Sequence, residues 1–188
     1  GNPEDDGLGF SLKWNMGWMH DFTEYMKLDP YFRKNAHHMM TFSMEYAYSE
    51  NYILVLSHDE VVHLKCSMLN KMPGYPDDKF KNLKAAYAFM IFHPGKKLLF
   101  MGQDIAEYDE WNEERGVEWE LLKYDHHEQI RRFVKRLNEL YRKNPALYAE
   151  DDSWDGFEWI SVDDRAHSVL AFLRKDAEGN KILCLFNF

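Results

Sequence analysis

Three chemically active side chains stand together in this sequence, directly after a hydrophobic run. Residues 53–56 read Ile-Leu-Val-Leu, and after one serine come His58, Asp59 and Glu60. An unbroken apolar run of this kind predicts a strand buried on both faces. In folds built from parallel strands, the functional groups lie at the carboxyl ends of the strands. We therefore expect this imidazole and these two carboxylates to form the functional site.

The segment from His58 to His63 also has the composition of a zinc-protease helix. The zinc pattern places its two histidines four positions apart, which brings them to one face of the helix. Here the separation is five positions, so the two rings would point roughly 140° apart around a helix. We therefore reject zinc and predict no bound metal. The G-x-G-x-x-G pattern is absent as well, so no nucleotide cofactor is expected.

The simplest alternative for this cluster is a solvated turn between a strand and a helix, with Asp59 or Glu60 as the helix N-cap. Three tryptophans favour a ligand instead, because Trp14, Trp18 and Trp111 all lie at or just after predicted strand ends. Each indole taken singly fits the core, but aromatic faces beside carboxylates suit the C–H faces and hydroxyls of sugar rings. The combination favours a polyhydroxylated substrate over a charged one.

Cleavage of a glycosidic bond needs two carboxyl groups that flank the bond, one as general acid and one as nucleophile or base. Asp59 is one candidate, and Asp104 and Asp21 are candidates for the second by position only. Because no second carboxyl clearly converges on the first, the residues alone indicate a sugar-acting site that is incomplete.

The composition limits the classes of partner. The 188 residues are 45% hydrophobic, enough for one sizeable core, and the net charge of -9 argues against a nucleic acid or an anionic membrane as partner. No apolar run approaches the ~18 residues of a membrane span, and residues 1–7 do not resemble a signal peptide. Cys66 and Cys184 lack metal-site spacing, which favours a reduced, cytoplasmic location. The missing initiator Met indicates a chain cut from a longer one.

Apolar runs and helical periodicity alternate along most of the chain. Strands are expected near residues 8–15, 52–56 and 97–101, and helices near 20–28, 39–49, 79–92 and 126–143. This order predicts a parallel sheet with helices outside it, either doubly wound or a (β/α)8 barrel. Residues 156–162, 167–175 and 181–188 alternate with period 2, which predicts three further strands, the last two joined as a hairpin by residues 176–180.

Two helix starts and one buried stripe are also predicted. Asp77-Asp78 offers an N-cap ahead of residues 79–92, and Asp125 with Glu128 resembles a capping box for residues 126–143. The helix near 79–92 is expected to bury a stripe made of Phe80, Leu83, Tyr87 and Ile91.

Longer stretches of the chain resemble a known family. They read GLGFSLKWNMGWMHD (residues 7–21), MTFSMEYAYSENYILVLSHDEVVH (40–63), FKNLKAAYAFMIFHPGKKLLFMG (80–102), EWN (110–112), VEWELL (117–122), NPALY (144–148) and GFEWI (156–160). Together and in this order they resemble bacterial 1,4-α-glucan branching enzymes of the α-amylase family of glycoside hydrolases. Within that family, KWNMGWMHD with LSHDEVVH is specific to branching enzymes, whereas a His-Asp pair alone would indicate only an α-amylase-like protein.

The resemblance implies an α/β fold. Residues 1–145 would be the carboxyl-terminal part of a (β/α)8 TIM barrel, with its sixth, seventh and eighth strands near 8–15, 52–56 and 97–101. Residues 146–188 would begin an all-β sandwich domain. The implied reaction cleaves an α-1,4 glucan chain with retention of configuration and transfers it to a glucan 6-hydroxyl. The implied partner is therefore an α-glucan.

The resemblance also implies roles for the clustered residues. Asp59 matches the family's third catalytic carboxylate, which favours the oxocarbenium-like transition state, and His58 matches a histidine that donates to the same ring. The residues further expected to bind substrate are Glu60, Trp14, Trp18, Trp111 and Asp104. For Glu60 the alternative stays open that it only orients its neighbours. The family's nucleophile and general acid lie on strands upstream of residue 1. We therefore expect the isolated chain to be inactive, and its open sheet edges to favour self-association.

Two positions depart from the family pattern. Leu64 stands where the family usually has glycine, so we expect a less sharply turned loop after residue 63. Residues 103–105 read Gln-Asp-Ile in place of Asn/Gly-Glu-Phe, which shortens the carboxylate at Asp104 by one methylene. Two alternative functions stay open: a related α-amylase-family hydrolase, such as one that forms trehalose, and a non-catalytic glucan-binding protein.

Overall fold

The computed structural model describes residues 3–5 and 7–188, so residues 1, 2 and 6 of the expected first domain lie outside the described residues. Its centre is a parallel sheet in the order β1 (Lys13–Trp14), β2 (Tyr52–Leu56) and β3 (Lys96–Leu99). The sheet order follows the chain order and all pairings are parallel, as predicted. Parallel neighbours need long crossover connections, and here these connections are helical.

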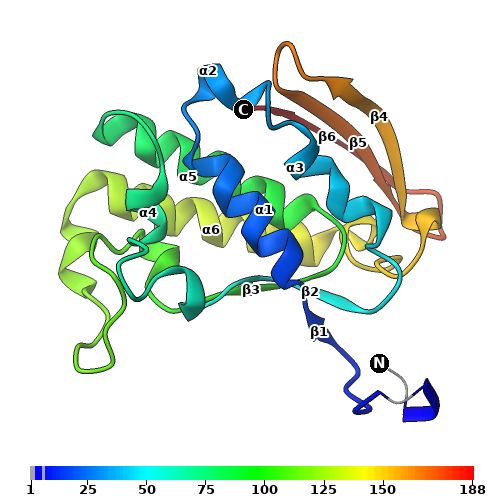
Figure 1. Ribbon diagram of the computed structural model, residues 1–188, viewed down its shortest axis with the longest axis horizontal. Helices are drawn as coiled ribbons and strands as arrows, with labels where there is room; N and C mark the ends of the chain where they lie inside the picture. The colour runs from blue at the N-terminus through cyan, green and yellow to red at the C-terminus, as the bar shows by residue number, and fades with distance from the viewer. Residues whose placement is uncertain (1–2, 6) are drawn as a thin grey trace.

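Helices and helical turns fill most of the chain between the strands. In chain order they are η1 (Pro3–Asp5), α1 (Met16–Lys27), α2 (Pro30–Arg33), α3 (His38–Thr41), η2 (Phe42–Glu45), η3 (His58–Glu60), α4 (Met68–Lys71), α5 (Pro76–Phe92), η4 (Gln103–Ile105), η5 (Trp119–Lys123), α6 (Asp125–Lys143), η6 (Pro145–Leu147) and η7 (Trp154–Gly156). Figure 1 shows α1, α5 and α6 together on one side of the parallel sheet.

The helices bury one face of the sheet, and α5 supplies much of the core. The predicted stripe is confirmed, because Phe80, Leu83, Tyr87 and Ile91 are all buried. The expectation of strands buried on both faces is confirmed for β2, where the consecutive residues Leu54, Val55 and Leu56 are all buried, but it is wrong for β1 and β3. Both residues of β1 are exposed and those of β3 are at most half-buried, because the helices cover a single side (Figure 1).

The start of α5 differs from the prediction. The helix begins at Pro76 with Tyr75 as its N-cap, so Asp77 and Asp78 lie in the first turn and cap nothing. Proline suits the first helical position because its missing N–H would have no partner there, and acidic side chains in the first turn favour the helix dipole.

The predicted capping box of α6 is also wrong. Asp125 is itself helical, and no side chain caps this end. Glu128 instead pairs with Arg131 and Arg132, at nitrogen–oxygen distances of 2.7 and 2.8 Å. The helix expected near 39–49 is split into α3 and η2, and the strand expected near 8–15 shrinks to β1, which pairs with β2 alone.

The chain ends in an antiparallel sheet in the order β4 (Phe157–Asp164), β5 (Val169–Lys175) and β6 (Lys181–Asn187). The predicted hairpin between β5 and β6 is confirmed. Asp176 accepts the backbone N–H of Asn180 at 2.9 Å, and Gly179 adopts the left-handed backbone that this turn requires.

The two sheets share one hydrophobic core. Phe89 of α5 lies with its ring centroid 5.3 Å from that of Phe186 and 5.6 Å from that of Phe188, both edge-on. His37 also contacts the carbonyl of Val162 at 2.8 Å. The boundary expected between residues 145 and 146 therefore runs through a continuously packed region, and the division into two domains stays a prediction.

A buried polar network, here called the junction network, lies where α5 meets the antiparallel sheet. Arg174 is fully buried and donates to the carbonyls of Phe92 and Gly156 and to the carboxylate of Asp151, the last at 2.6 Å. The Lys97 ammonium donates to the carbonyl of His93. The fold thus joins its two sheets by aromatic packing and by charged hydrogen bonds.

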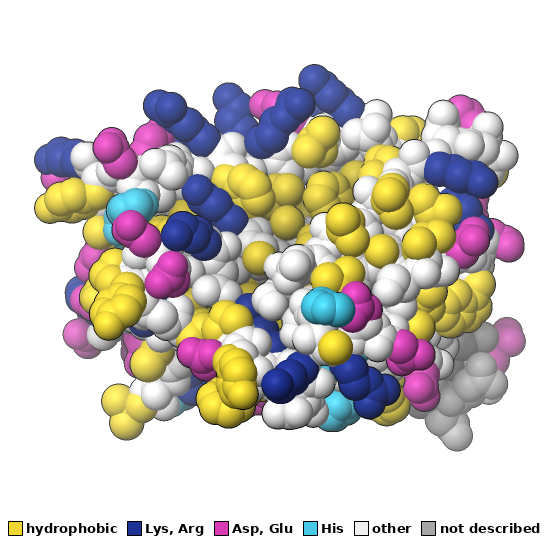
Figure 2. Space-filling view, turned by 90° about the horizontal axis from the view of Figure 1, so that it is seen from above, with side chains coloured by type: hydrophobic (Ala, Val, Ile, Leu, Met, Phe, Trp, Pro, Cys, Tyr) yellow, Lys and Arg dark blue, Asp and Glu magenta, His cyan; other side chains and the backbone are white. Residues whose placement is uncertain are grey.

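The surface of the molecule is unevenly charged. In Figure 2, Lys and Arg side chains gather along one edge of the face, and hydrophobic side chains lie between charged ones elsewhere. Positive charge is thus concentrated on part of this face, although the net charge of the chain is -9. In the ranges 3–5 and 7–188, no helix combines the length and apolar character that crossing a membrane requires.

Candidate functional site

The polar residues after β2 form a short helical turn, η3, that is capped by a buried serine. The Ser57 hydroxyl accepts the backbone N–H of Asp59 at 3.2 Å and donates to the Asp59 carboxylate at 3.1 Å. The cap of this turn is therefore Ser57, not Asp59 or Glu60 as the alternative interpretation held. Because serine takes the capping role, the Asp59 side chain is left partly open to solvent.

His58 and Asp59 lie side by side at the carboxyl end of the central strand. The two side chains are 48% and 41% exposed, and His58 Nε2 lies 3.5 Å from Asp59 Oδ1. The imidazole also contacts two aromatic rings, with its centroid 5.9 Å from that of Phe100 and 6.4 Å from that of Trp111. The structure thus brings together an imidazole, a carboxylate and an indole, as the sequence predicted.

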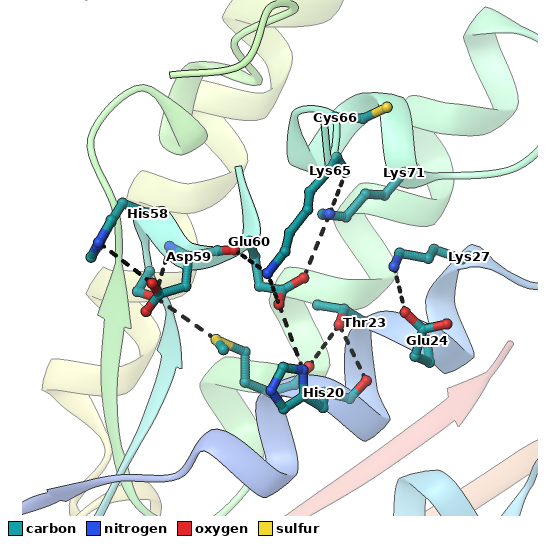
Figure 3. Close-up of polar contacts among 12 residues, drawn as sticks. His20, Thr23, Glu24, Lys27, His58, Asp59, Glu60, Lys65, Cys66 and Lys71 are labelled. Carbon is teal, nitrogen blue, oxygen red and sulfur yellow. Dashed lines mark hydrogen bonds and ion pairs between the residues drawn. The ribbon is translucent and has the colours of Figure 1, made fainter. Parts of the chain in front are cut away.

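Glu60 points the other way, and its predicted contact with substrate is wrong for this structure. Its side chain is only 4% exposed, because the η3 turn directs it beneath the strand end. The Lys71 ammonium lies 3.5 Å away and is equally buried, while Lys65 and His20 each lie 3.8 Å away (Figure 3). Burial lowers the pKa of Lys71, and the charge of Glu60 opposes that shift. Glu60 therefore supports the turn from below.

The backbone after η3 is strained. His63, Leu64 and Cys66 have φ values of 56°, 66° and 65°, in the left-handed region. This conformation costs a non-glycine residue roughly 1–2 kcal/mol. The expected relaxation of the loop at Leu64 is therefore wrong: leucine takes the glycine-like conformation and the turn stays sharp. We call residues 63–66 the left-handed turn.

The loop that follows β3 reaches across to this left-handed turn. The Glu110 carboxylate accepts the backbone N–H groups of Leu64 and Cys66, at 3.1 and 2.5 Å. The next residue, Trp111, donates its own backbone N–H to the carbonyl of Val61 at 3.0 Å. Within the turn, Lys65 donates to the carbonyl of Asp59 at 2.7 Å. Two adjacent strands thus supply loops that are tied directly to each other.

Sequence reasoning missed the residues that support the site, namely Lys65, Lys71 and Glu110. The contacts of Glu110 span 44 and 46 positions along the chain. No local pattern marks such a contact, because it depends on the left-handed turn that presents the two N–H groups. The motif around Glu60 signalled a charge cluster but not which of its charges is buried.

The three tryptophans have different surroundings. Trp18 is 1% exposed and stacks on Phe22 at 4.6 Å, so its predicted role in substrate binding is wrong for this structure. Its burial follows from its place on the core-facing side of α1. Trp111 is half-buried against Phe100 and His58. Trp14 is 41% exposed on β1, beside the strand that carries the site, and its role in binding stays a prediction.

The other candidate carboxylates lie elsewhere. Asp104 lines a separate groove of about 560 Å³ with Trp119 and Arg131 of the helical side, so its predicted contact at the site is not supported. Asp21 lies on α1, near Tyr46, where its charge adds to burial in raising the pKa of that phenol. In the part of the chain that the structure describes, no three His, Cys, Asp or Glu side chains gather as a metal site requires.

Comparison with known sequences confirms the resemblance. The chain is 59% identical over 186 residues to "1,4-alpha-glucan branching enzyme GlgB" of Butyrivibrio fibrisolvens, covering 98% of this chain and 29% of that protein. It is 54% identical over 172 residues to the protein of the same name from Thermosynechococcus vestitus, covering 92% of this chain and 22% of that protein. The chain thus spans less than a third of the length of these curated relatives.

A family model and solved structures agree with the fold. The model described as the alpha amylase C-terminal all-beta domain matches residues 159–188, within the antiparallel sheet. A cyclomaltodextrinase superposes with a TM-score of 0.67 at 18% identity, over 95% of this chain and 29% of that one. A Bacillus subtilis type I pullulanase in complex with maltose superposes with a TM-score of 0.69 at 12% identity, over 93% and 28%. The α/β part and the antiparallel sheet thus have the arrangement found in these two solved structures.

Proposed function

We propose that this chain is part of a 1,4-α-glucan branching enzyme and supplies one side of its glucan-binding active site. The observation that supports this most strongly is the partly exposed pair of His58 and Asp59 beside Trp111, at the carboxyl end of β2. It occurs in a chain that resembles branching enzymes along nearly all of its length. The parallel sheet β1–β3 would then be the last three strands of a (β/α)8 barrel.

The reaction would cleave an α-1,4 linkage with retention and transfer the chain to a 6-hydroxyl of another glucan. As the bond breaks, positive charge develops on the anomeric carbon. The Asp59 carboxylate would stabilise that charge and hold ring hydroxyls, since one of its oxygens is oriented by the Ser57 hydroxyl. His58 would donate a hydrogen bond to the same ring, and the indole of Trp111 would line the sugar's apolar face.

The nucleophile and the general acid would come from strands that precede this chain in the full-length protein. Residues 146–188 would be the start of an all-β sandwich domain that follows the barrel. The whole protein would act on glycogen- or amylose-like chains in the cytoplasm.

The test uses the full-length protein that contains these residues, incubated with amylose. We expect new α-1,6 anomeric signals in the proton NMR spectrum and little increase in reducing ends, because chains are transferred to a sugar and not to water. Reducing ends without α-1,6 linkages would indicate a hydrolase and contradict the proposal. Glucan binding with neither product would indicate a non-catalytic binding protein and contradict it equally.

The isolated chain provides a second test. Residues 1–188 alone should show no branching activity, because both groups that make and break the glycosyl bond are expected outside them. Activity in a preparation free of full-length protein would refute this assignment. We also propose that β1 and β3, whose outer edges are unpaired among the described residues, favour self-association of the isolated chain. Sedimentation of the isolated chain would detect it.

A further inference from the structure

The left-handed turn at residues 63–66 is not held by packing of its own side chains. Leu64 is 94% exposed, and Cys66 is exposed as well. Left-handed backbone is unfavourable for both residues, so an unsupported turn of this sequence would relax. Something outside the turn must therefore keep it in place.

Glu110 is the side chain that can do so. Its two carboxylate oxygens accept two different N–H groups of the turn, one from Leu64 and one from Cys66. Alternating N–H groups of a turn that contains left-handed residues form a concave anion site, and here a carboxylate of the same chain occupies it. The backbone of the neighbouring Trp111 is tied to Val61, so the carboxylate is anchored close to its target.

The left-handed turn also positions Lys65 against the proposed active site. Lys65 lies between the two clamped residues, and its ammonium donates to the backbone carbonyl of Asp59 at 2.7 Å. The backbone carbonyl of Lys65 accepts a hydrogen bond from the buried ammonium of Lys71 at 2.5 Å. A displacement of the turn would move Lys65 and release the backbone at Asp59.

We infer that Glu110 is a positioning residue, which clamps the left-handed turn so that Lys65 fixes the backbone of Asp59 in the geometry that the reaction needs. This inference rests on the proposed branching function. Glu110 touches neither substrate nor the reacting atoms in this scheme, and it acts through the turn alone. Its loss should therefore lower kcat, while KM for the glucan should change little.

The test compares four variants of the full-length protein with the wild type. Glu110→Gln keeps the shape of the side chain but places an amide NH2 against one backbone N–H, which breaks half of the clamp. We expect kcat to fall about 10-fold with KM within about twofold, because small displacements of catalytic groups are costly. Glu113→Gln, an exposed carboxylate three positions further along the same loop, is the matched control and should leave kcat unchanged.

The third and fourth variants test whether Glu110 affects Asp59 through the left-handed turn. Glycine adopts left-handed backbone without strain, so Leu64→Gly with Cys66→Gly makes the clamp dispensable. Added to Glu110→Gln, these changes should restore kcat to within about threefold of the wild type. On their own they should leave kcat unchanged. A fall in kcat that glycine does not rescue would overturn the inference, because Glu110 would then act by another route.

Hydrogen exchange supplies a readout that does not need turnover. A peptide covering residues 61–68 should exchange faster in Glu110→Gln than in the wild type or in Glu113→Gln. Faster exchange with an unchanged kcat would reduce Glu110 to a structural role and overturn the inference, as would unchanged exchange. A wild type without branching activity would instead be a failure of the proposed function, and the exchange comparison would still show whether the clamp exists.

Discussion

The candidate active site and the junction network are both built around charged side chains, but they are arranged in opposite ways. At the junction network, Arg174 is fully buried and makes hydrogen bonds to three acceptors. At the site, His58 and Asp59 are about half exposed and share a single 3.5 Å contact. In the junction network the charged groups are hydrogen-bonded to one another and to the backbone, whereas at the candidate site His58 and Asp59 keep hydrogen-bonding capacity for a ligand.

The two regions also differ in where burial acts on protonation. At the junction network, burial lowers the pKa of His93 to about 3 and that of Lys97 to about 7. His93 is only 1% exposed, so its imidazole is closed to a substrate. Strong pKa shifts are often used to locate active sites, but here they mark the joint between two sheets. Exposure, backbone strain and aromatic neighbours together distinguish the site better than burial does.

Removing the central cation of the junction network should give the largest effect. Arg174→Met leaves the buried Asp151 carboxylate with the Lys96 ammonium, at 3.1 Å, as its remaining ion-pair partner. We expect the free energy of unfolding to fall by about 3–5 kcal/mol. The measurement is the urea midpoint of the full-length protein, compared with that of the variant at the same pH. The double variant Arg174→Met with Asp151→Leu should recover much of the loss, because the buried carboxylate is removed together with its guanidinium partner. An unchanged midpoint in the single variant would show that the network contributes little to stability.

At the site, the corresponding change should affect the reaction and not the fold. Asp59→Asn keeps the shape of the side chain but removes the charge that faces the transition state. We expect kcat to fall at least ~10²-fold in the full-length protein, with an unchanged thermal midpoint. Asp163→Asn, at an exposed aspartate of β4, is the control and should leave kcat unaltered. Near-normal turnover in Asp59→Asn would refute the role given to this residue.

The pH dependence of stability sharpens the comparison, because it reports on the junction network. The folded pKa of His93 lies near 3, below the ordinary value of 6.5, so between these values the unfolded chain binds a proton that the folded chain does not. Stability should therefore rise with pH across this window, by up to ~1.4 kcal/mol per unit, and be lost as pH falls. The lowered pKa of Asp151 acts in the same direction.

Urea midpoints between pH 4 and 6.5 measure this slope. His93→Gln keeps a hydrogen-bonding side chain without the titration, so it should flatten the slope in this window. The contribution of Asp151 lies mainly below its ordinary pKa of 3.8. An identical slope in the variant would exclude His93 as its source.

An exposed ion pair should give the smallest effect. Lys175 and Glu158 lie 3.2 Å apart on neighbouring strands of the antiparallel sheet, with side chains 24% and 52% exposed. Exposed pairs are screened by water, so Lys175→Met should change the stability by no more than about 0.5 kcal/mol. A loss as large as that expected for Arg174→Met would mean that burial is not what separates the two regions. Denaturation of the wild type and Lys175→Met at low and high salt would measure the contribution of this ion pair to stability.

The parts of the molecule that local patterns determine could be predicted from the sequence. The apolar run at β2 and the stripe on α5 gave the parallel sheet and its helical cover, and the polar residues after β2 gave the site. Trp18 could also have been placed correctly. With Phe22 and Tyr25 it forms a helical stripe, but the helix was expected to begin at residue 20 and not at Met16.

Other features depend on contacts that no local pattern contains. Glu60 looked equivalent to Asp59 in the sequence, yet the η3 turn buries one carboxylate and exposes the other. The left-handed backbone at Leu64 runs against the preference of leucine and exists together with Glu110, which lies 46 positions away. Such features could be found only once the two loops were seen side by side.

The aromatic cluster around Phe89 has a consequence for anyone who recombines proteins of this kind. Because Phe186 of β6 and the following residue, Phe188, pack against α5, which connects β2 to β3, the carboxyl-terminal region cannot be exchanged independently of that helix. A chimera spliced at residue 145 would place aromatic rings from a different protein against Phe89, without the packing that Phe186 and Phe188 provide here. A graft that carries α5 along with the antiparallel sheet would preserve the fit.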